Sequence, residues 1–135
     1  MTRDRRTLGW VPLALLIVVY ALPAWAVTVT PTGTILTVDY DEPSTNADGT
    51  PLTDLKETVV FYAFPGLPPV LCVTTPATTT TGGVHRSVAC TVSVVEGQDV
   101  EITVMATARD LNGNAGAPSD PVVTRIDRLA PARIQ

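Results

Sequence analysis

Residues 99–126 constrain the fold most, because they read as two β-strands joined by a turn. Apolar and polar residues alternate from Val100 to Arg109, and Met105 is the one apolar residue on the polar side. This period of two is typical of a strand with one buried face. A loop rich in Asn and Gly follows, and the chain returns as a second strand over 121–126. A chain that contains such a hairpin is expected to build a β-sheet.

Other parts of the chain also have strand character. Such stretches cover 27–30, 34–40, 56–64, 70–73 and 84–95. The third of these has apolar residues on both faces and is expected at the centre of a sheet, whereas the threonine-rich run 74–83 predicts a mobile connection. No segment after Ala26 has the apolar spacing of a helix. The pattern predicts an all-β fold, an immunoglobulin-like antiparallel β-sandwich of about seven strands, although a small barrel could use the same strands.

Residues 1–26 are predicted to be a signal peptide helix that precedes this domain. Arg3, Arg5 and Arg6 form a basic start, residues 8–22 are almost entirely apolar, and the segment ends in Ala-Trp-Ala. These are the parts of a Sec-type signal peptide, with cleavage expected after Ala26. The domain would then occupy 27–127 and a C-terminal tail 128–135. The expected location is secreted or periplasmic.

Two other interpretations of the leader stay open. Residues 7–26 have about the length that a membrane-spanning helix needs, so an uncleaved leader would be an anchor and the only contact with a membrane. The pair Arg5-Arg6 also suggests a twin-arginine signal. The usual aromatic-leucine-lysine continuation is missing, however, and this favours the Sec pathway.

The charge of the chain argues against nucleic acid as a partner. The net charge of −4 becomes −6 after loss of the leader, because Lys+Arg falls from 9 to 6 and Asp+Glu from 13 to 12. Lys56 is the only lysine. Binding to phosphates requires clustered basic residues. No nucleic-acid partner is therefore expected.

The two cysteines, Cys72 and Cys90, both lie in the exported part of the chain. In an oxidising compartment two cysteines most simply form one disulfide. The alternative is a zinc site with His85 as a third ligand. It lacks the four ligands of a typical site, so the disulfide is favoured.

The chain offers little that resembles a catalytic set. His85 is the only histidine, and it follows the mobile run without an obvious base and acid partner. Carboxylate pairs such as Asp39 with Asp41 lie on polar strand faces, where solvated charges are the ordinary explanation. The protein is therefore expected not to be an enzyme, and no cofactor is predicted.

Three motifs occur in the order and spacing of one known family. Residues 36–63 read LTVDYDEPSTNADGTPLTDLKETVVFYA, residues 108–114 read ARDLNGN, and residues 118–120 read PSD. Their sequence resembles bacterial fibronectin type III domains, in which they would form the second and third strands and the loop between the last two. The resemblance covers most of 27–127.

The chain also departs from that family. Tyr40 stands where a core Trp is usual, and Ile102 stands where the family often has the tyrosine of the corner between the fifth and sixth strands. The resemblance places Cys72 on or near the fourth strand and Cys90 on the fifth. A bridge between them would tie the two sheets, or their edge, and would compensate for the missing corner hydrogen bond.

The resemblance implies that two polar loops lie at the same end of the sandwich. Their candidate binding residues are Asn46, Asp48, Asp110, Asn112 and Asn114. The last three match the start of a calcium loop, but the Gly and the terminal Glu of that pattern are missing. Their residue types are also those that tight turns require, so the turn interpretation is favoured and no metal is predicted.

These observations lead to one expected function and one alternative. We expect a secreted, non-enzymatic module for protein or surface interaction, in adhesion or in envelope or extracellular assembly. Its partner would be a protein or a cell-surface polymer. The alternative is an accessory module that assists an extracellular hydrolase or a carbohydrate-binding partner. Fold alone does not decide between them.

Overall fold

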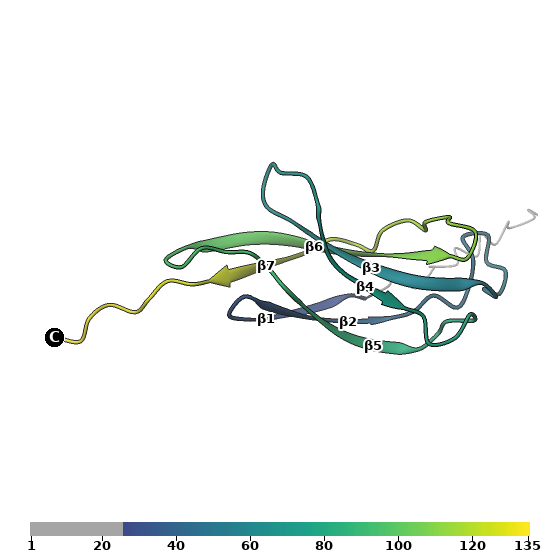
Figure 1. Ribbon diagram of the computed structural model, residues 1–135, viewed down its shortest axis with the longest axis horizontal. Coiled ribbons are helices and arrows are strands. Elements are labelled where there is room, and N and C mark those ends of the chain that lie inside the picture. The colour runs from purple at the N-terminus through teal and green to yellow at the C-terminus, as the bar shows by residue number, and fades with distance from the viewer. Residues whose placement is uncertain (1–25) are drawn as a thin grey trace, which may run out of the picture.

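A computed structural model describes residues 26–135 and shows seven strands in two antiparallel sheets that pack face to face (Figure 1). The strands are β1 (Thr28–Thr32), β2 (Ile35–Asp41), β3 (Leu55–Ala63), β4 (Val70–Pro76), β5 (His85–Thr91), β6 (Asp99–Asp110) and β7 (Val122–Asp127). One sheet has the order β1-β2-β5 and the other β4-β3-β6-β7. The predicted antiparallel sandwich is confirmed, and two separate sheets exclude the barrel. The predicted signal peptide lies almost entirely outside the described residues.

Three predicted strand boundaries differ from the structure by more than one residue. β1 continues through Pro31 to Thr32, which an edge strand tolerates because its outer side needs no hydrogen-bond donor. β4 continues to Pro76, so the start of the threonine-rich run belongs to a strand. β5 ends at Thr91, short of the predicted Val95. The regular pairing with β2 ends at Thr91, and one further hydrogen bond follows, from the Val92 amide to the Thr34 carbonyl oxygen.

The alternation of residues decides which side chains form the core between the sheets. On β6, the even-numbered residues Ile102, Val104 and Ala106 point inward and are buried, as predicted. Leu36 and Val38 of β2 face them from the opposite sheet and are fully buried. The same core includes Tyr40, Val60, Tyr62, Cys90, Val92, Val94 and Ile126. Burial of these apolar side chains is the main source of the fold's stability.

The disulfide between Cys72 and Cys90 closes one side of the sandwich. Cys72 lies on β4 and Cys90 on β5, which are edge strands of different sheets. Their Cα atoms are 5.6 Å apart, within the range that a disulfide spans. The predicted bridge between the sheets is thus present. Because it uses both sulfur atoms, the zinc alternative with His85 is excluded.

No described residue, from 26 to 135, belongs to a helix that is long and apolar enough to cross a membrane.

Candidate functional site

Asp110 organises the loop between β6 and β7, which was predicted to be part of a binding surface. Its Oδ1 accepts hydrogen bonds from the backbone amides of Asn112, at 2.9 Å, and Asn114, at 2.8 Å. Its Oδ2 accepts one from the side-chain amide of Asn114, also at 2.8 Å. These donors, the Asn114 side chain foremost, lower the pKa of the Asp110 carboxyl group below its ordinary value. Both carboxylate oxygens therefore hold the turn together.

The loop between β2 and β3 has a similar arrangement of its own. The Asp48 Oδ1 accepts hydrogen bonds from the hydroxyl of Thr50, at 2.6 Å, and from its backbone amide, at 3.0 Å. These bonds lower the pKa of Asp48. The Asn46 side-chain amide donates to the Thr50 hydroxyl and to the Pro51 carbonyl oxygen. All of these groups are exposed, so the loop is ordered by its own side chains and not by burial.

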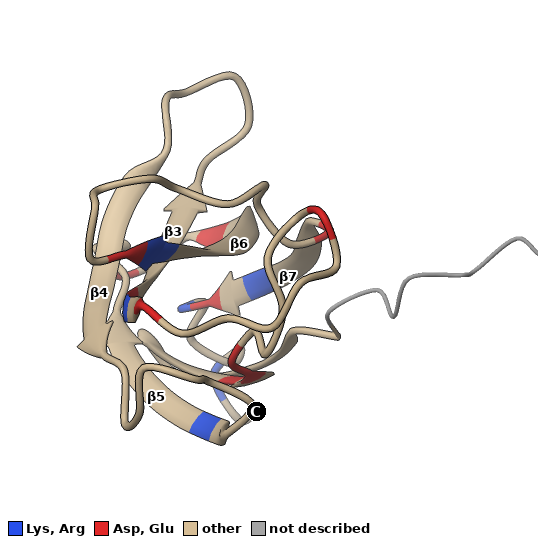
Figure 2. Cartoon of the chain, turned by 90° about the vertical axis from the view of Figure 1, so that its right-hand side faces the viewer, with Lys and Arg blue, Asp and Glu red and all other residues tan. Residues whose placement is uncertain are grey.

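Asp54 joins the two loops. Its Oδ2 accepts a hydrogen bond from the Asn112 side-chain amide at 3.1 Å, and its backbone carbonyl oxygen accepts one from the Leu111 amide at 2.8 Å. The contact arises because the antiparallel register of β3 and β6 pairs Leu55 with Asp110. Figure 2 looks onto this end of the sandwich and shows acidic residues on the loops and strand ends there. The two loops meet as the resemblance implied.

The structure brings the five predicted residues together only in part. Asp110, Asn112 and Asn114 form one network that extends to Asp54, whereas Asn46 and Asp48 form a second network around Thr50. Within residues 26–135, no hydrogen bond joins the two networks. Nor do three His, Cys, Asp or Glu side chains gather anywhere in this range as a metal site would require.

The sequence reasoning missed Asp54, although it stands in the turn-rich stretch before β3. Its importance depends on the register of β3 against β6, which residue types alone do not specify. A useful signal would have been the position of Asp54 directly before β3, the strand that pairs with β6. We define the loop-end surface as Asn46, Asp48, Asp54, Asp110, Asn112 and Asn114.

His85 lies near this end, at the start of β5, but its contacts are those of a surface residue. Its Nδ1 lies 2.8 Å from the Asp41 Oδ1, and both side chains are exposed. The next residue, Arg86, has a buried partner: its Nη1 lies 3.7 Å from the Oε1 of Glu42, whose side chain is only 1% exposed. Arg86 also donates to the hydroxyl of Thr78. Arg86 thus ties Thr78, in the connection between β4 and β5, to Glu42 directly after β2.

No protein-family model and no curated protein matches the chain. What the loop-end surface can bind therefore depends on its geometry alone.

Proposed function

We propose that the chain is an exported, non-enzymatic fibronectin type III-like module that binds a protein or a cell-surface polymer through its loop-end surface. The observation that carries this proposal is the double contact of Asp54 with Leu111 and Asn112. It fixes two loops against each other and leaves polar side chains exposed around the junction. A site that is already ordered loses less conformational entropy when a partner binds.

The arrangement of the strands supports the family part of the proposal. Seven strands in two antiparallel sheets are shared by immunoglobulin and fibronectin type III domains. In the constant type of immunoglobulin domain the fourth strand belongs to the same sheet as the fifth. Here β4 pairs with β3 in the other sheet, as the fibronectin type III resemblance implies. Tyr40 and Ile102, the two departures from the family pattern, are both buried in the core.

The contacts of the only histidine support a non-enzymatic role. His85 is paired with Asp41, and neither side chain is buried. Among residues 26–135, no Ser, Thr or Cys side chain is hydrogen-bonded to the His85 ring, although a nucleophile and its base are normally within such reach. The two cysteines are joined in the disulfide. The proposal therefore assigns His85 no part in catalysis.

The proposal is tested by capture of partners from the native envelope and extracellular fractions with the purified protein as bait. Asn46→Ala combined with Asn112→Ala removes exposed amide groups from both loops of the loop-end surface. The matched control is Glu96→Ala, in the connection between β5 and β6 at the other end of the sandwich. Wild type and control should retain a protein or a polysaccharide that the double variant loses.

The identity of the captured partner then decides between the functions. An adhesion or assembly protein supports the proposal. A hydrolase, or a polysaccharide alone, indicates the accessory role instead. Equal capture by all three proteins would overturn the assignment of the loop-end surface.

A further inference from the structure

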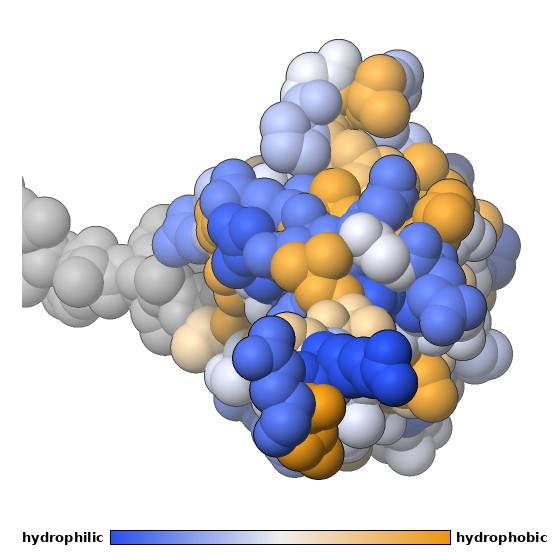
Figure 3. All heavy atoms as spheres, turned by 90° about the vertical axis from the view of Figure 1, so that its left-hand side faces the viewer, coloured by the Kyte–Doolittle hydropathy of each residue, from blue (hydrophilic) through white to orange (hydrophobic). Residues whose placement is uncertain are grey.

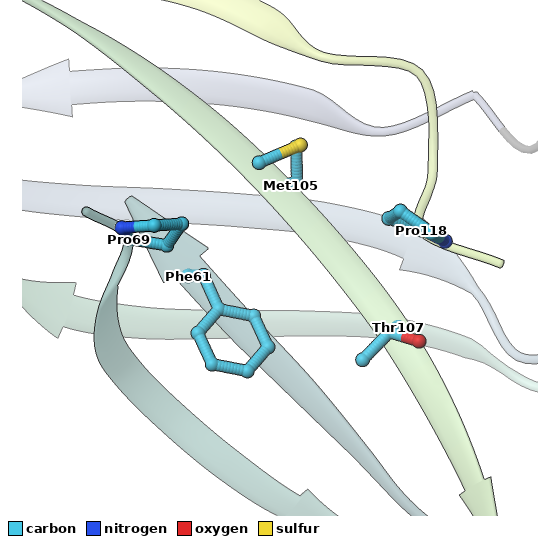
Figure 4. A pocket seen from close by; sticks show the side chains of 5 residues that line it. All are labelled: Phe61, Pro69, Met105, Thr107 and Pro118. Carbon is cyan, nitrogen blue, oxygen red and sulfur yellow. The ribbon is translucent and has the colours of Figure 1, made fainter. Parts of the chain in front are cut away.

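The outer face of the four-stranded sheet carries an apolar patch in the middle. Leu71, Phe61 and Met105 lie side by side in register across β4, β3 and β6. Phe61 and Met105, together with Pro69, Thr107 and Pro118, line an open hollow of about 260 Å³ (Figure 4). Leu71 lies beside it and is 57% exposed. We define the outer patch as Phe61, Pro69, Leu71, Met105, Thr107 and Pro118.

The connection between β3 and β4 stands up next to this patch. It rises from the four-stranded sheet on the side away from the other sheet (Figures 1 and 2). Leu67 near its tip is 61% exposed, and hydrophobic side chains are visible on the projection at the top of Figure 3. The face therefore has an apolar floor and, at one end of the strands, an apolar wall.

Among the described residues, charged side chains lie on this face only towards the two ends of the strands. At one end Arg109 of β6 lies 3.5 Å from Glu57 of β3. At the other end Glu101 of β6 is paired in register with Arg125 of β7, which also binds Asp99 at 2.7 Å. The chain has no charged Asp, Glu, Lys or Arg side chain from Thr58 to Val84. An apolar centre with a charged rim is the typical composition of a protein interface.

We propose that two copies of this chain pair through the outer patch, face to face, with the strands of one copy antiparallel to those of the other. The wall and the charged rim together favour this orientation. A two-fold axis parallel to the strands would bring both walls to the same end of the paired sheets. An axis across the strands places them at opposite ends, so that each Leu67 packs against the far end of the second copy's sheet.

The distribution of charge favours a second copy of the chain as the partner of the outer patch. A chain with a net charge of −4, or −6 without the leader, repels itself over most of its surface, but the outer patch is uncharged. Glu101 and Arg109 lie at equal distances in sequence on either side of Met105, on the same face of β6. In the antiparallel arrangement Arg109 of each copy therefore faces Glu101 of the other. Such reciprocal contacts are characteristic of a two-fold interface.

A concentration series by sedimentation velocity and light scattering tests the proposal with the purified exported protein. The wild type should form a dimer whose dissociation constant rises about 30-fold or more in Leu71→Glu, because a charge would be buried at the centre of the interface. The matched control is Ile35→Glu, since Ile35 is 47% exposed on the outer side of the other sheet. It should leave the dissociation constant unchanged.

Charge reversal tests the orientation of the two copies. Arg109→Glu and Glu101→Arg should each weaken the dimer, and the double variant should restore it, because the reversed charges again face each other across the interface. Thermal unfolding of each variant at a concentration where it is monomeric separates loss of pairing from loss of folding. Additive weakening in the double variant would overturn the antiparallel arrangement. A wild type that stays monomeric would overturn the interface, even if the patch captured some other protein. Equal dissociation constants for Leu71→Glu and Ile35→Glu would overturn it as well.

Discussion

Gly82 lies so close to Pro43 that a Cβ atom at Gly82 would overlap the Pro43 carbonyl oxygen. Gly82 also has a φ of 61°, in the left-handed region that side chains disfavour. The next residue, Gly83, donates its amide to the carbonyl oxygen of Glu42 at 3.1 Å. The connection between β4 and β5 is thereby packed directly onto the chain that leaves β2.

Replacement of Gly82 by Ala should destabilise the fold by about 3 kcal/mol or more, since backbone strain adds to a steric overlap that no flexible side chain can relieve. Urea unfolding of the purified variant measures this loss. The matched control is Gly66→Ala, because Gly66 has a φ of 73° but no atom that would touch a Cβ. Only the conformational cost of about 1–2 kcal/mol is expected there. Equal losses in the two variants would show that the close approach has no energetic effect.

The disulfide should supply a large part of the stability of the sandwich. Cys72 and Cys90 are 18 residues apart in the chain, and a closed loop of this size is worth about 3 kcal/mol. Replacement of both residues by Ser should lower the free energy of unfolding by about that amount. Guanidinium unfolding measures it. The intact mass of the wild type should be lower by two hydrogens than that of the reduced protein, and free thiols in the wild type would contradict the bridge.

The pair of Glu42 and Arg86 should matter more than an ordinary surface ion pair. The Glu42 side chain is buried, so removal of its counter-charge leaves a carboxylate that water cannot reach. Arg86→Met should therefore cost about 3 kcal/mol in unfolding free energy. The double variant Glu42→Gln with Arg86→Met should recover part of the loss. Arg109→Met, which removes a half-buried partner of Glu57, is the control and should cost about 1 kcal/mol or less.

Periodicity predicted the fold well because one face of each strand is buried. The alternation from Val100 to Ala108 identified the inward side of β6 correctly, and apolar residues on both faces of β3 indicated a central strand. Val59 is fully buried, and Phe61 lines the hollow on the outer face. The boundaries were less accurate, because Val92 and Val94 are buried without being part of a strand.

The contacts between distant segments could not be predicted in the same way. Asp54 meets Asn112, and Glu42 meets Arg86, through register and loop packing that no local pattern specifies. The threonine-rich run looked like a mobile connection from its composition. In the structure its residues are bonded at several points, including Thr80, whose carbonyl oxygen accepts from the Leu55 amide. Composition describes local preference, whereas these bonds depend on the surrounding fold.

The turn at Asp110 should make stability depend on pH in the acidic range. The hydrogen bonds from Asn114 and Asn112 hold the pKa of Asp110 in the folded protein below its ordinary value of 3.8. The ionised carboxylate therefore stabilises the fold at pH values above the unfolded pKa, and this contribution is lost as the pH falls through the lower folded value. Wild type should thus melt at a higher temperature than Asp110→Asn at about pH 6, and the gap should narrow as the pH falls below the ordinary value of 3.8. Asp120→Asn is the control. Within residues 26–135 the Asp120 carboxylate accepts no hydrogen bond from a side chain or the backbone, so the melting temperature of this variant should follow that of the wild type at every pH. A gap between wild type and Asp110→Asn that stays constant with pH would mean that the variant acts through altered packing of the loop and not through the lost charge.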